Sequence, residues 1–508
     1  MDKREQLKQL DEQLLAGLMA ETDGLPPEEV VGAVTPWKTA IHRILAGMVL
    51  TTITLNFYGL NYLLPLIGMV LLLLGTRTLR KENSWMKGCF GLTVARTGLL
   101  MVQLLRNTTV RFDLLMDRFP YASLLQGVEG FLVVLLTFGT IVCLWRGLAA
   151  IRRKAGLPEK NGTGASLLVW YGLTCILALV NYNGLILPLA MLVVYLLIIR
   201  GLYKLSHSLD EAGFVVQPAP VKLSDWAVAA VIAGVLAAGA LVSYLFLSGY
   251  PMDWQPDSRT QSAQREEISD QLAELGFPEG ILDDLTDEDI LACKDAAAVV
   301  VTTNNYPVND GNLVWSGRSS RTVYEVKELR ITGIGVLLEG ERERWKLFHY
   351  FTWTTDPGFP GTESIQIWPT SRLSEGWWMD GEPSGRLLVD RDGQTYTAPY
   401  AFLGSQSYTT GSFLFGGQPQ TDLFAAFSLP RWGENKRGYV SYTVGEAMDG
   451  YIINSWINYT HQRSWFQYPV ESAMENQLSG SWNLNGPFKL VQDALQFYPT
   501  EEEIKMLS

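Results

Sequence analysis

Histidine and cysteine are scarce in this chain, which has four residues of each among its 508. After residue 250 only His349, His461 and Cys293 remain, so this half has no internal disulfide to stabilise it. The sequence also lacks an HExxH or other metal-ligand spacing, a GxSxG motif and a glycine-rich phosphate loop. We therefore expect no enzyme activity, no metal and no cofactor. The cysteine usage is typical of a bacterial surface domain rather than an exported animal one.

Charged residues are also few, at 18% of the chain, and they are unevenly divided. Residues 1–250 carry 21 Lys and Arg against 16 Asp and Glu, whereas residues 251–508 carry 19 against 36. An acidic half of this kind repels a polyanion, so no nucleic-acid partner is expected. A hydrophobic content of 47% excludes a disordered chain.

Long apolar runs occupy the first half of the chain. The runs at residues 44–76 and 161–199 are each too long for one membrane span of about 20 residues, and each has a turn signal in its middle, at residues 58–61 and 181–184. Three further runs lie at residues 88–105, 125–144 and 226–247. The sequence therefore predicts an α-helical membrane bundle of seven spans within residues 41–250, embedded in a lipid bilayer.

The basic residues between these spans predict the orientation of the bundle. With the N-terminus inside, 17 Lys and Arg residues fall in inner segments, and only Arg106, Arg111 and Arg118 fall in outer loops. Basic residues favour the cytoplasmic side of a membrane protein. We therefore expect a plasma-membrane protein with residues 1–40 in the cytoplasm. An odd number of spans then makes the acidic second half extracellular.

Two polar side chains are expected inside the predicted bilayer region. Arg96 lies near the middle of the third span, and Glu129 lies in the fourth span near its outer end. The two spans are consecutive, so a long arginine side chain is expected to reach the carboxylate. The pair then either gates an ion path or holds a helix hairpin together, and the structural role is preferred.

Small residues recur at every fourth position of the last span, at Ala230, Gly234 and Ala238. This spacing lets helix backbones approach closely. Packing within the chain is the preferred interpretation, and a face for a dimer or a partner helix is the alternative. A shift of 123 residues also aligns Leu64-Pro65-Leu66 with Leu187-Pro188-Leu189, which suggests a duplicated helical unit or a chance match of leucine-rich helices.

The N-terminal arm, residues 1–36, has a leucine stripe at helical spacing followed by a Gly-Leu-Pro-Pro break. No secretory signal peptide is expected here, because the first forty residues are polar and charged. The predicted helix either contacts a cytoplasmic partner, packs on an inner loop, or lies on the membrane surface. Its mixed charge argues against the last alternative.

The secondary structure that the sequence predicts for the second half changes along its length, from helices to strands. Residues 255–310 predict a small helical segment, in which Thr286 and the acids after it form a helix-capping box. In residues 311–508, short runs such as Leu329–Leu338 and Ser364–Trp368 alternate with turn residues. This pattern is typical of a β-rich α+β domain built on an antiparallel sandwich or barrel, with helices expected near Glu471–Leu478 and Phe488–Phe497.

The tryptophans of the second half provide a candidate binding surface. Trp377 and Trp378 are adjacent, so in a strand they face opposite ways, and at least one should be exposed or lie in a cleft. Exposed aromatic side chains mark sites that bind sugar rings or protein partners. A tryptophan-rich core is the preferred role for most of the others.

Two segments of the second half resemble a group of uncharacterised bacterial multi-pass membrane proteins, mostly of Gram-positive type. They are QLAELGFPEGILDDLTDEDILACKDA, at residues 271–296, and VSYTVGEAMDGYIINSWINYTHQRSWFQYPV, at residues 440–470. The resemblance implies a bacterial cell-surface setting and no particular chemistry.

The sequence leaves two functions open. The leading hypothesis is a membrane-anchored surface protein whose extracellular β-rich domain binds a ligand, a cell-wall glycan or a surface protein. The alternative is a transport component with the bundle as conduit and the outer domain as cap or receptor. The few polar residues inside the spans favour the anchor.

Overall fold

The computed structural model describes residues 36–507, apart from 54, 56–58, 111–120, 159–161, 181, 183, 185, 213–215, 217–218, 259–261, 309–311, 317–318, 324–326, 411–417, 465–466 and 480–485. The chain forms two compact units: a helical unit up to Gly239 and a β-rich unit from Ala240 onward, which also takes in residues 107–117. The helix predicted for the N-terminal arm lies outside the described residues, except for residue 36.

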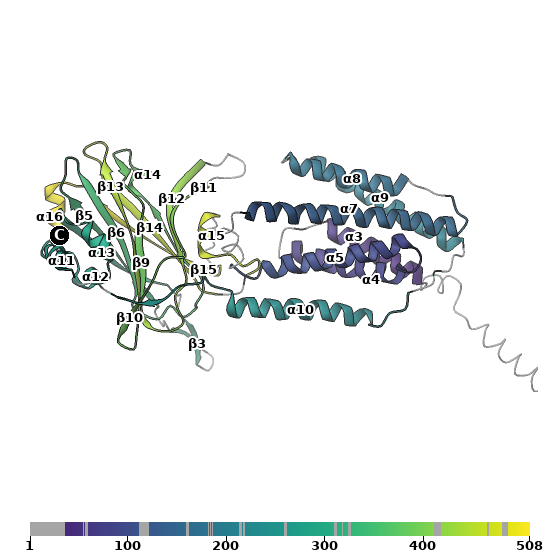
Figure 1. Ribbon diagram of the computed structural model, residues 1–508, viewed down its shortest axis with the longest axis horizontal. Coiled ribbons are helices and arrows are strands. Elements are labelled where there is room, and N and C mark those ends of the chain that lie inside the picture. Colours follow the sequence, from purple (N-terminus) through teal and green to yellow (C-terminus); the bar gives the residue numbers. More distant parts are fainter. Residues whose placement is uncertain are drawn as a thin grey trace, which may run out of the picture. The chain divides into compact units, whose positions relative to one another are not determined.

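In the described part of the apolar half, the structure contains seven long helices (Figure 1). They are α3 (Pro36–Thr52), α4 (Leu60–Leu79), α5 (Ser84–Arg106), α7 (Ala122–Lys154), α8 (Gly162–Leu179), α9 (Ile186–Glu211) and α10 (Asp225–Phe246). Within the described residues, six of them are long and apolar enough to cross a membrane. The exception is α3, whose 17 residues rise about 26 Å, less than the hydrocarbon thickness of about 30 Å. Seven spans are therefore not confirmed.

Basic side chains join several helix ends at one end of the helical unit. The Asp225 carboxylate at the start of α10 accepts hydrogen bonds from Arg43 of α3, at 2.5 Å, and from Arg77 of α4. The Arg152 guanidinium near the end of α7 donates to the Leu205 carbonyl oxygen near the end of α9. The helices therefore alternate in direction, and the first residues of α3 and α10 lie at the same end as the last residues of α4.

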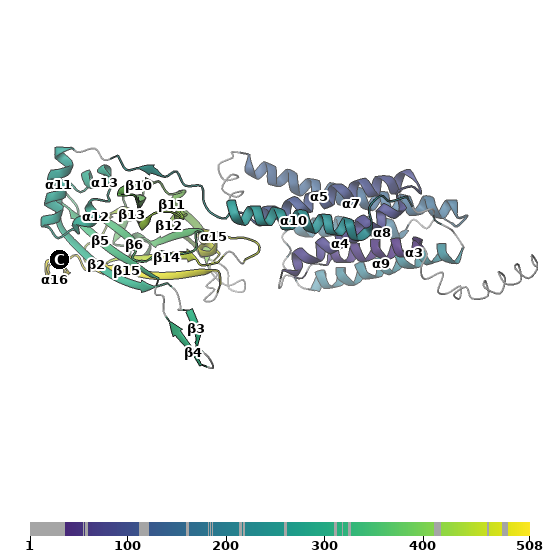
Figure 2. The same cartoon turned by 90° about the horizontal axis from the view of Figure 1, so that it is seen from below.

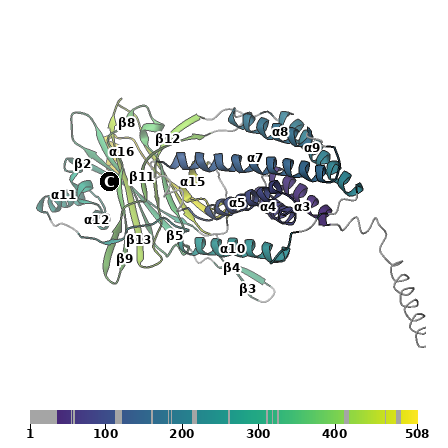
Figure 3. The same ribbon diagram turned by 45° about the vertical axis from the view of Figure 1, so that its right-hand side comes forward.

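The helices α3 and α4 run antiparallel in very close contact. A Cβ atom on Gly47 would lie 2.6 Å from the Gly68 carbonyl oxygen, and one on Gly75 would lie 2.7 Å from the Ala40 carbonyl oxygen. Only glycine allows the two backbones to approach this closely. α3 therefore lies alongside much of α4 and is buried by its neighbours. Figure 3 shows α3, α4 and α5 in the middle of the unit, with α8 and α9 at one edge and α10 at the other.

The 123-residue shift aligns this crossing with a second one. It places Gly47 on Trp170 of α8 and Gly68 on Met191 of α9. These two residues are also in contact, because the Trp170 indole donates a hydrogen bond of 2.8 Å to the Met191 carbonyl oxygen. Two helical hairpins whose turns are 123 residues apart have contacts at equivalent positions in either case, so the duplicated unit and the chance match both stay predictions.

The β-rich unit contains two large antiparallel sheets and one hairpin (Figure 2). One sheet has the order β1-β10-β9-β13-β6-β5-β2, with β8 paired to β13, and the other has the order β11-β12-β7-β14-β15. The strands are β1 (Gln255–Pro256), β2 (Ala296–Pro307), β3 (Asn312–Ser316), β4 (Ser319–Val323), β5 (Glu328–Leu338), β6 (Arg344–Trp353), β7 (Glu363–Trp368), β8 (Trp377–Met379), β9 (Ser384–Arg391), β10 (Gln394–Ala398), β11 (Phe402–Thr410), β12 (Gln418–Phe427), β13 (Glu434–Glu446), β14 (Ile453–Gln462) and β15 (Phe488–Phe497). β3 and β4 form the hairpin.

The two sheets share one hydrophobic core. Its fully buried side chains come from both sheets, for example Phe351 and Leu347 from β6 and Ile365 and Phe427 from β7 and β12. The helices α11 (Ala263–Glu274), α12 (Glu279–Leu282) and α13 (Asp287–Leu291) cover the other face of the β6 sheet and form a second core with it. The predicted β-rich fold with two antiparallel layers is therefore present.

One local prediction, the helix cap, is confirmed, and one hairpin turn has the conformation that its residues favour. The Thr286 side chain caps α13 and accepts a hydrogen bond of 3.2 Å from the Asp289 backbone N–H. Asp392 and Gly393 both have positive φ, at 53° and 77°, and they connect β9 to β10. This conformation is the one that an Asp-Gly turn favours in a two-residue hairpin.

Two predicted segments are wrong. Residues 255–310 are not only helical, because they include the twelve-residue strand β2. Residues 488–497 form the strand β15 rather than a helix, while α15 (Ala473–Leu478) and α16 (Glu501–Leu507) are the helices near the C-terminus. Asp493 hides the strand alternation, because this acid takes a buried position, where it accepts a hydrogen bond of 3.0 Å from the Asn304 amide.

Candidate ligand-binding face

The structure places Trp377 and Trp378 on opposite sides of β8, as the alternation of a strand requires. Trp377 is buried in the core between the sheets, and its indole donates a hydrogen bond of 3.1 Å to the Ile452 carbonyl oxygen. Trp378 is 45% exposed and lies over Gly445 of the paired strand. Of the two predicted site residues, only Trp378 is therefore on the surface.

A larger group of aromatic and polar side chains lies on the outer face of the five-stranded sheet. In β7, Ile365 and Ile367 point into the core, so Gln366 and Trp368 point outward. We define the Trp368 face by the outward residues that neighbour this tryptophan: Gln366, Trp368, Arg372, Tyr408, Gln420, Asp422, Asn454 and Trp456. They come from four strands and from α14 (Thr370–Leu373).

A buried carboxylate organises the polar part of this face. Asp422 accepts hydrogen bonds from the Arg372 guanidinium at 2.5 Å, from the Tyr408 hydroxyl at 2.6 Å and from the Gln366 amide at 2.7 Å. Burial and the neighbouring Asp422 carboxylate raise the pKa of Tyr408 to about 12, so its hydroxyl keeps its proton and donates. The network fixes the Arg372 side chain at the edge of the tryptophan pair.

The aromatic part of the Trp368 face is a pair of half-buried indoles. The ring centroids of Trp368 and Trp456 are 6.1 Å apart, and the Arg372 guanidinium lies 4.8 Å above the Trp368 ring. Within the described residues the Trp368 Nε1 atom is buried without a hydrogen-bond partner, whereas the Trp456 indole donates to the Asn454 side chain at 2.7 Å. The two partly exposed rings form a surface on which the apolar face of a ligand can stack.

The helix α15 covers the neighbouring part of the same sheet. The Gln477 amide donates a hydrogen bond of 3.0 Å to the Asn458 backbone, and its oxygen accepts one of 2.7 Å from Ser364. The capping box of Ser472 and Glu475 holds the start of this helix. One part of the sheet is thus closed by protein, while Trp368 and Trp456 remain half-buried beside it.

The structure does not form the predicted pair of Arg96 and Glu129. Glu129 instead accepts hydrogen bonds from Arg106 at 2.7 Å and from Gln103 at 2.8 Å. Arg106 is ten residues beyond Arg96, which is about 15 Å along the helix, so Glu129 meets the end of α5 rather than its middle. Within the described residues, the Arg96 side chain makes no hydrogen bond or ion pair.

The small-residue stripe of α10 does not pack inside the chain. Ala230 is half-buried, Gly234 and Ala238 are exposed, and a Cβ atom on Gly234 would meet nothing within 4 Å. The close contact of α10 is instead made by Gly239, where a Cβ atom would lie 2.5 Å from the Leu105 side chain. The preferred interpretation, packing within the chain, is therefore wrong, and the partner face stays a prediction.

The two histidines of the β-rich unit are buried and bonded. His349 lies 2.7 Å from the Ser455 hydroxyl, and burial lowers the pKa of His349 to about 3. His461 lies 2.7 Å from the Glu363 carboxylate in the core between the sheets. Within the part of the chain that the structure describes, no cluster of three metal-ligating side chains occurs.

The Trp368 face was not predicted from the sequence, although a signal for it exists. In Ser364–Trp368 the apolar and polar positions alternate, and the same is true of Ile453–Tyr459, so Trp368 and Trp456 both fall on polar faces. The assignment of both to one sheet face requires the strand order, since β7 and β14 are about 85 residues apart in the chain.

No family model matches the chain, and no curated protein matches it either. Among solved structures, the chain is similar to the KRT10-binding region domain of the pneumococcal serine rich repeat protein PsrP, at 15% sequence identity and a TM-score of 0.16. The match covers 32% of this chain and 84% of that chain. A likeness at this score carries no argument about fold or function.

Proposed function

We propose that this chain is a membrane-anchored surface protein whose β-rich unit binds a glycan through the Trp368 face. The helical unit anchors it in the plasma membrane, with the N-terminus in the cytoplasm and the β-rich unit outside the cell. The observation that carries the proposal is the pair of half-buried indoles beside a guanidinium that the Asp422 network holds in place. The resemblance to Gram-positive membrane proteins agrees with a wall glycan as the ligand.

The proposed orientation of the helices in the membrane rests on the arginines that gather at one end of the helical unit. Arg43, Arg77 and Arg152 lie at this end, and cytoplasmic loops are the ones enriched in basic residues. α10 begins at this end with Asp225 and leads into the β-rich unit at its other end. α3 then has to cross as a seventh, short span. Its burial against α4 supports this, because a helix shielded by its neighbours needs less apolar surface.

The chemistry of the Trp368 face fits a sugar better than a protein partner. The electron-rich faces of the indoles accept the C–H groups of a pyranose ring, while the guanidinium and amides bond its hydroxyls. Among the described residues of this face, the positions around the two indoles are polar, such as Gln420, Asn454 and Gln496. We therefore assign the ligand to the class of polar glycans.

A transport role for the helical unit has less support. A conduit for polar solutes requires a continuous polar cavity past Arg96. The enclosed cavity beside Arg96 is about 20 Å³, enough for a single water molecule, and Ile44, Leu72 and Leu144 contribute to its wall. An anchor requires no such cavity, so this observation favours anchoring.

The test of the proposal uses the full-length protein in nanodiscs and purified cell-wall glycan. Trp456→Ala and Trp368→Ala are expected to weaken binding about tenfold, because each removes one ring of the platform. Trp378→Ala is the matched control, since it removes an exposed tryptophan from a different sheet. Protease added to intact cells should also cleave the β-rich unit.

Each outcome of this test separates the hypotheses. Loss of binding only in Trp378→Ala would move the site to β8. Equal binding by all three variants would refute the Trp368 face. Protection of the β-rich unit from external protease, with digestion only after lysis, would place it in the cytoplasm and refute the surface role.

A further inference from the structure

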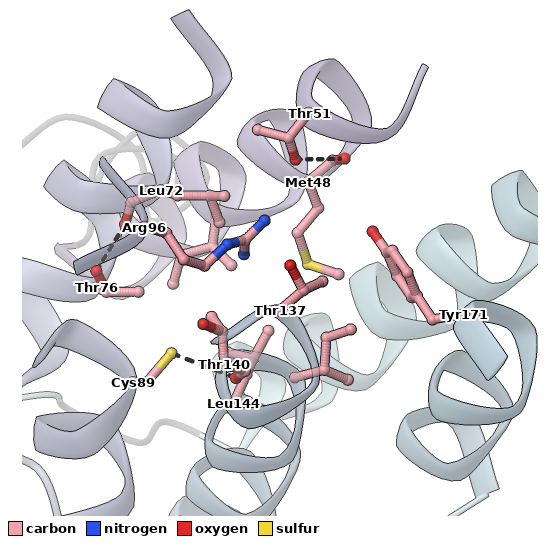
Figure 4. Close-up of a pocket in the computed structure, with 12 residues that line it drawn as sticks. Met48, Thr51, Leu72, Thr76, Cys89, Arg96, Thr137, Thr140, Leu144 and Tyr171 are labelled. Atoms are coloured by element: carbon pink, nitrogen blue, oxygen red, sulfur yellow. Dashed lines mark hydrogen bonds between the residues drawn. The ribbon is translucent and has the colours of Figure 1, made fainter. Parts of the chain in front are cut away.

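Arg96 lies between two cavities of the helical unit. Figure 4 shows its guanidinium pointing into the enclosed cavity, among Met48, Thr51 and Thr137. The same residue also lines a second, more open cavity of about 140 Å³. An arginine has five N–H donors and remains charged in a protein, so it needs acceptors on both sides.

The enclosed cavity provides acceptors but no negative charge. The hydroxyls of Thr51, Thr76, Thr137 and Thr140 line it, and each donates its proton to a carbonyl oxygen of its own helix at 2.7–2.9 Å. Their oxygen lone pairs are therefore free to accept from Arg96 or from one water molecule. These oxygens are neutral, so they do not balance the charge of the guanidinium.

The second cavity provides almost no acceptors. Its wall consists of Pro65, Met69, Leu99, Leu100 and Val133, together with Thr51, Gln103 and Arg96. The Gln103 amide is bonded to Glu129, whose charge is balanced by Arg106. Val133 is exposed, so this wall reaches the outer surface of the helical unit, which faces acyl chains if the helices span a bilayer.

We propose that a single-chain amphiphile binds in the second cavity, with its chain along Pro65, Leu99 and Leu100 and its carboxylate or phosphate on Arg96, where the second cavity adjoins the enclosed one. A planar guanidinium pairs with two anionic oxygens at once, so the ligand supplies the negative charge that the described residues do not provide beside Arg96. The apolar wall accounts for the acyl chain. The inference rests on the proposal that the helices span a bilayer, and it is independent of the glycan.

The experiment uses the full-length protein in nanodiscs of zwitterionic lipid. Photo-crosslinkable palmitate and palmitoyl lysophosphatidate are the charged probes, and monopalmitoylglycerol is the neutral probe with the same chain. Inorganic phosphate is added as a competitor without a chain. We expect at least one charged probe to label α4 or α5, the neutral probe to label about tenfold less, and inorganic phosphate not to compete.

Variants then assign the site. Arg96→Gln is expected to reduce labelling about tenfold, whereas Arg146→Gln, which removes an exposed arginine near the other end of the unit, should not change it. Leu99→Trp should block the cavity and reduce labelling while Arg96 is retained. It serves as the second variant in case Arg96→Gln does not fold.

Three outcomes would overturn the inference. One is equal labelling by the charged and neutral probes on the unmodified protein. The second is competition by inorganic phosphate, which would make the site one for a free anion. The third is unchanged labelling in a folded Arg96→Gln or Leu99→Trp variant. None of these results depends on glycan binding or on the side of the membrane, so the two proposals fail separately.

Discussion

Two charged side chains, one in each unit, differ in whether the fold supplies a partner of opposite charge. In the β-rich unit, Asp289 is buried and receives the Lys346 ammonium at 2.9 Å together with hydrogen bonds from the Tyr439 and Ser384 hydroxyls at 2.6 Å. In the helical unit, Arg96 has no ion pair within the described residues and lines two cavities. The first charge is a structural element of the fold. The second is the charge that we propose to pair with a group from outside the chain.

The largest effect is expected from breaking the paired charge. Lys346→Met removes the cation from Asp289 and leaves a buried carboxylate, which costs about 3–5 kcal/mol in the free energy of unfolding of the β-rich unit. Chemical denaturation followed by tryptophan fluorescence measures this change. Lys505→Met is the control, because Lys505 is exposed beside Glu501. A loss of unfolding free energy below about 1 kcal/mol in Lys346→Met would contradict the contrast between the paired Asp289 and Arg96.

Acid should destabilise the β-rich unit through a second buried group. Burial lowers the pKa of His349 to about 3, from about 6.5 in the unfolded chain. The contribution of the neutral imidazole is therefore complete above pH 6.5 and is lost as the pH falls toward 3. Between pH 6.5 and 4.5 the loss amounts to about 2 kcal/mol.

The variant His349→Gln isolates this effect from the titration of other groups. It should flatten the unfolding free energy between pH 6.5 and 4.5 relative to the unmodified protein, even if it lowers stability at neutral pH. Parallel pH profiles for the two proteins would show that folding does not lower the pKa of His349.

A packing change in the helical unit should have an intermediate effect. Gly47→Val places side-chain atoms against the Gly68 carbonyl oxygen and forces α3 away from α4, at a cost of about 1–3 kcal/mol. Gly234→Val is the matched control, because a Cβ atom there meets nothing within 4 Å. Thermal stability in nanodiscs measures both. An equal loss of thermal stability in the two variants would mean that the exchange of glycine for valine itself causes it, and not the close contact between α3 and α4.

The smallest stability effect is expected at the unpaired charge. Arg96→Gln removes a guanidinium that has no ion pair, so the helical unit should lose less than about 1 kcal/mol in the absence of an amphiphile. Resistance to unfolding in mixed micelles is the measurement. A loss as large as that of Lys346→Met would show that Arg96 is a structural charge and would remove the contrast between the units.

Local patterns in the sequence were sufficient for much of the fold. Apolar runs located α4, α5, α8, α9 and α10, and alternating runs located strands such as β5 and β7. The turn at Asp392 and the cap at Thr286 follow from side-chain chemistry within four residues. The strand β15 was missed because the buried Asp493 breaks its apolar alternation, and a partner from β2 compensates it.

The candidate sites required information that no local pattern contains. The partner of Glu129 depends on the offset between α5 and α7, and the sequence predicted Arg96 where the structure has Arg106. The role of the tryptophans depends on strand order: Trp377 is in the core, and Trp368 meets Trp456 across two paired strands.

By itself, the sequence determined an apolar helical half, a basic bias between its helices, and an acidic β-rich half without disulfides, because composition and periodicity act over a few residues at a time. The tertiary structure alone decided which charges are neutralised and which aromatic rings share a surface. Helix offsets and sheet order result from packing over the whole unit, since each side chain meets partners that are remote in the chain.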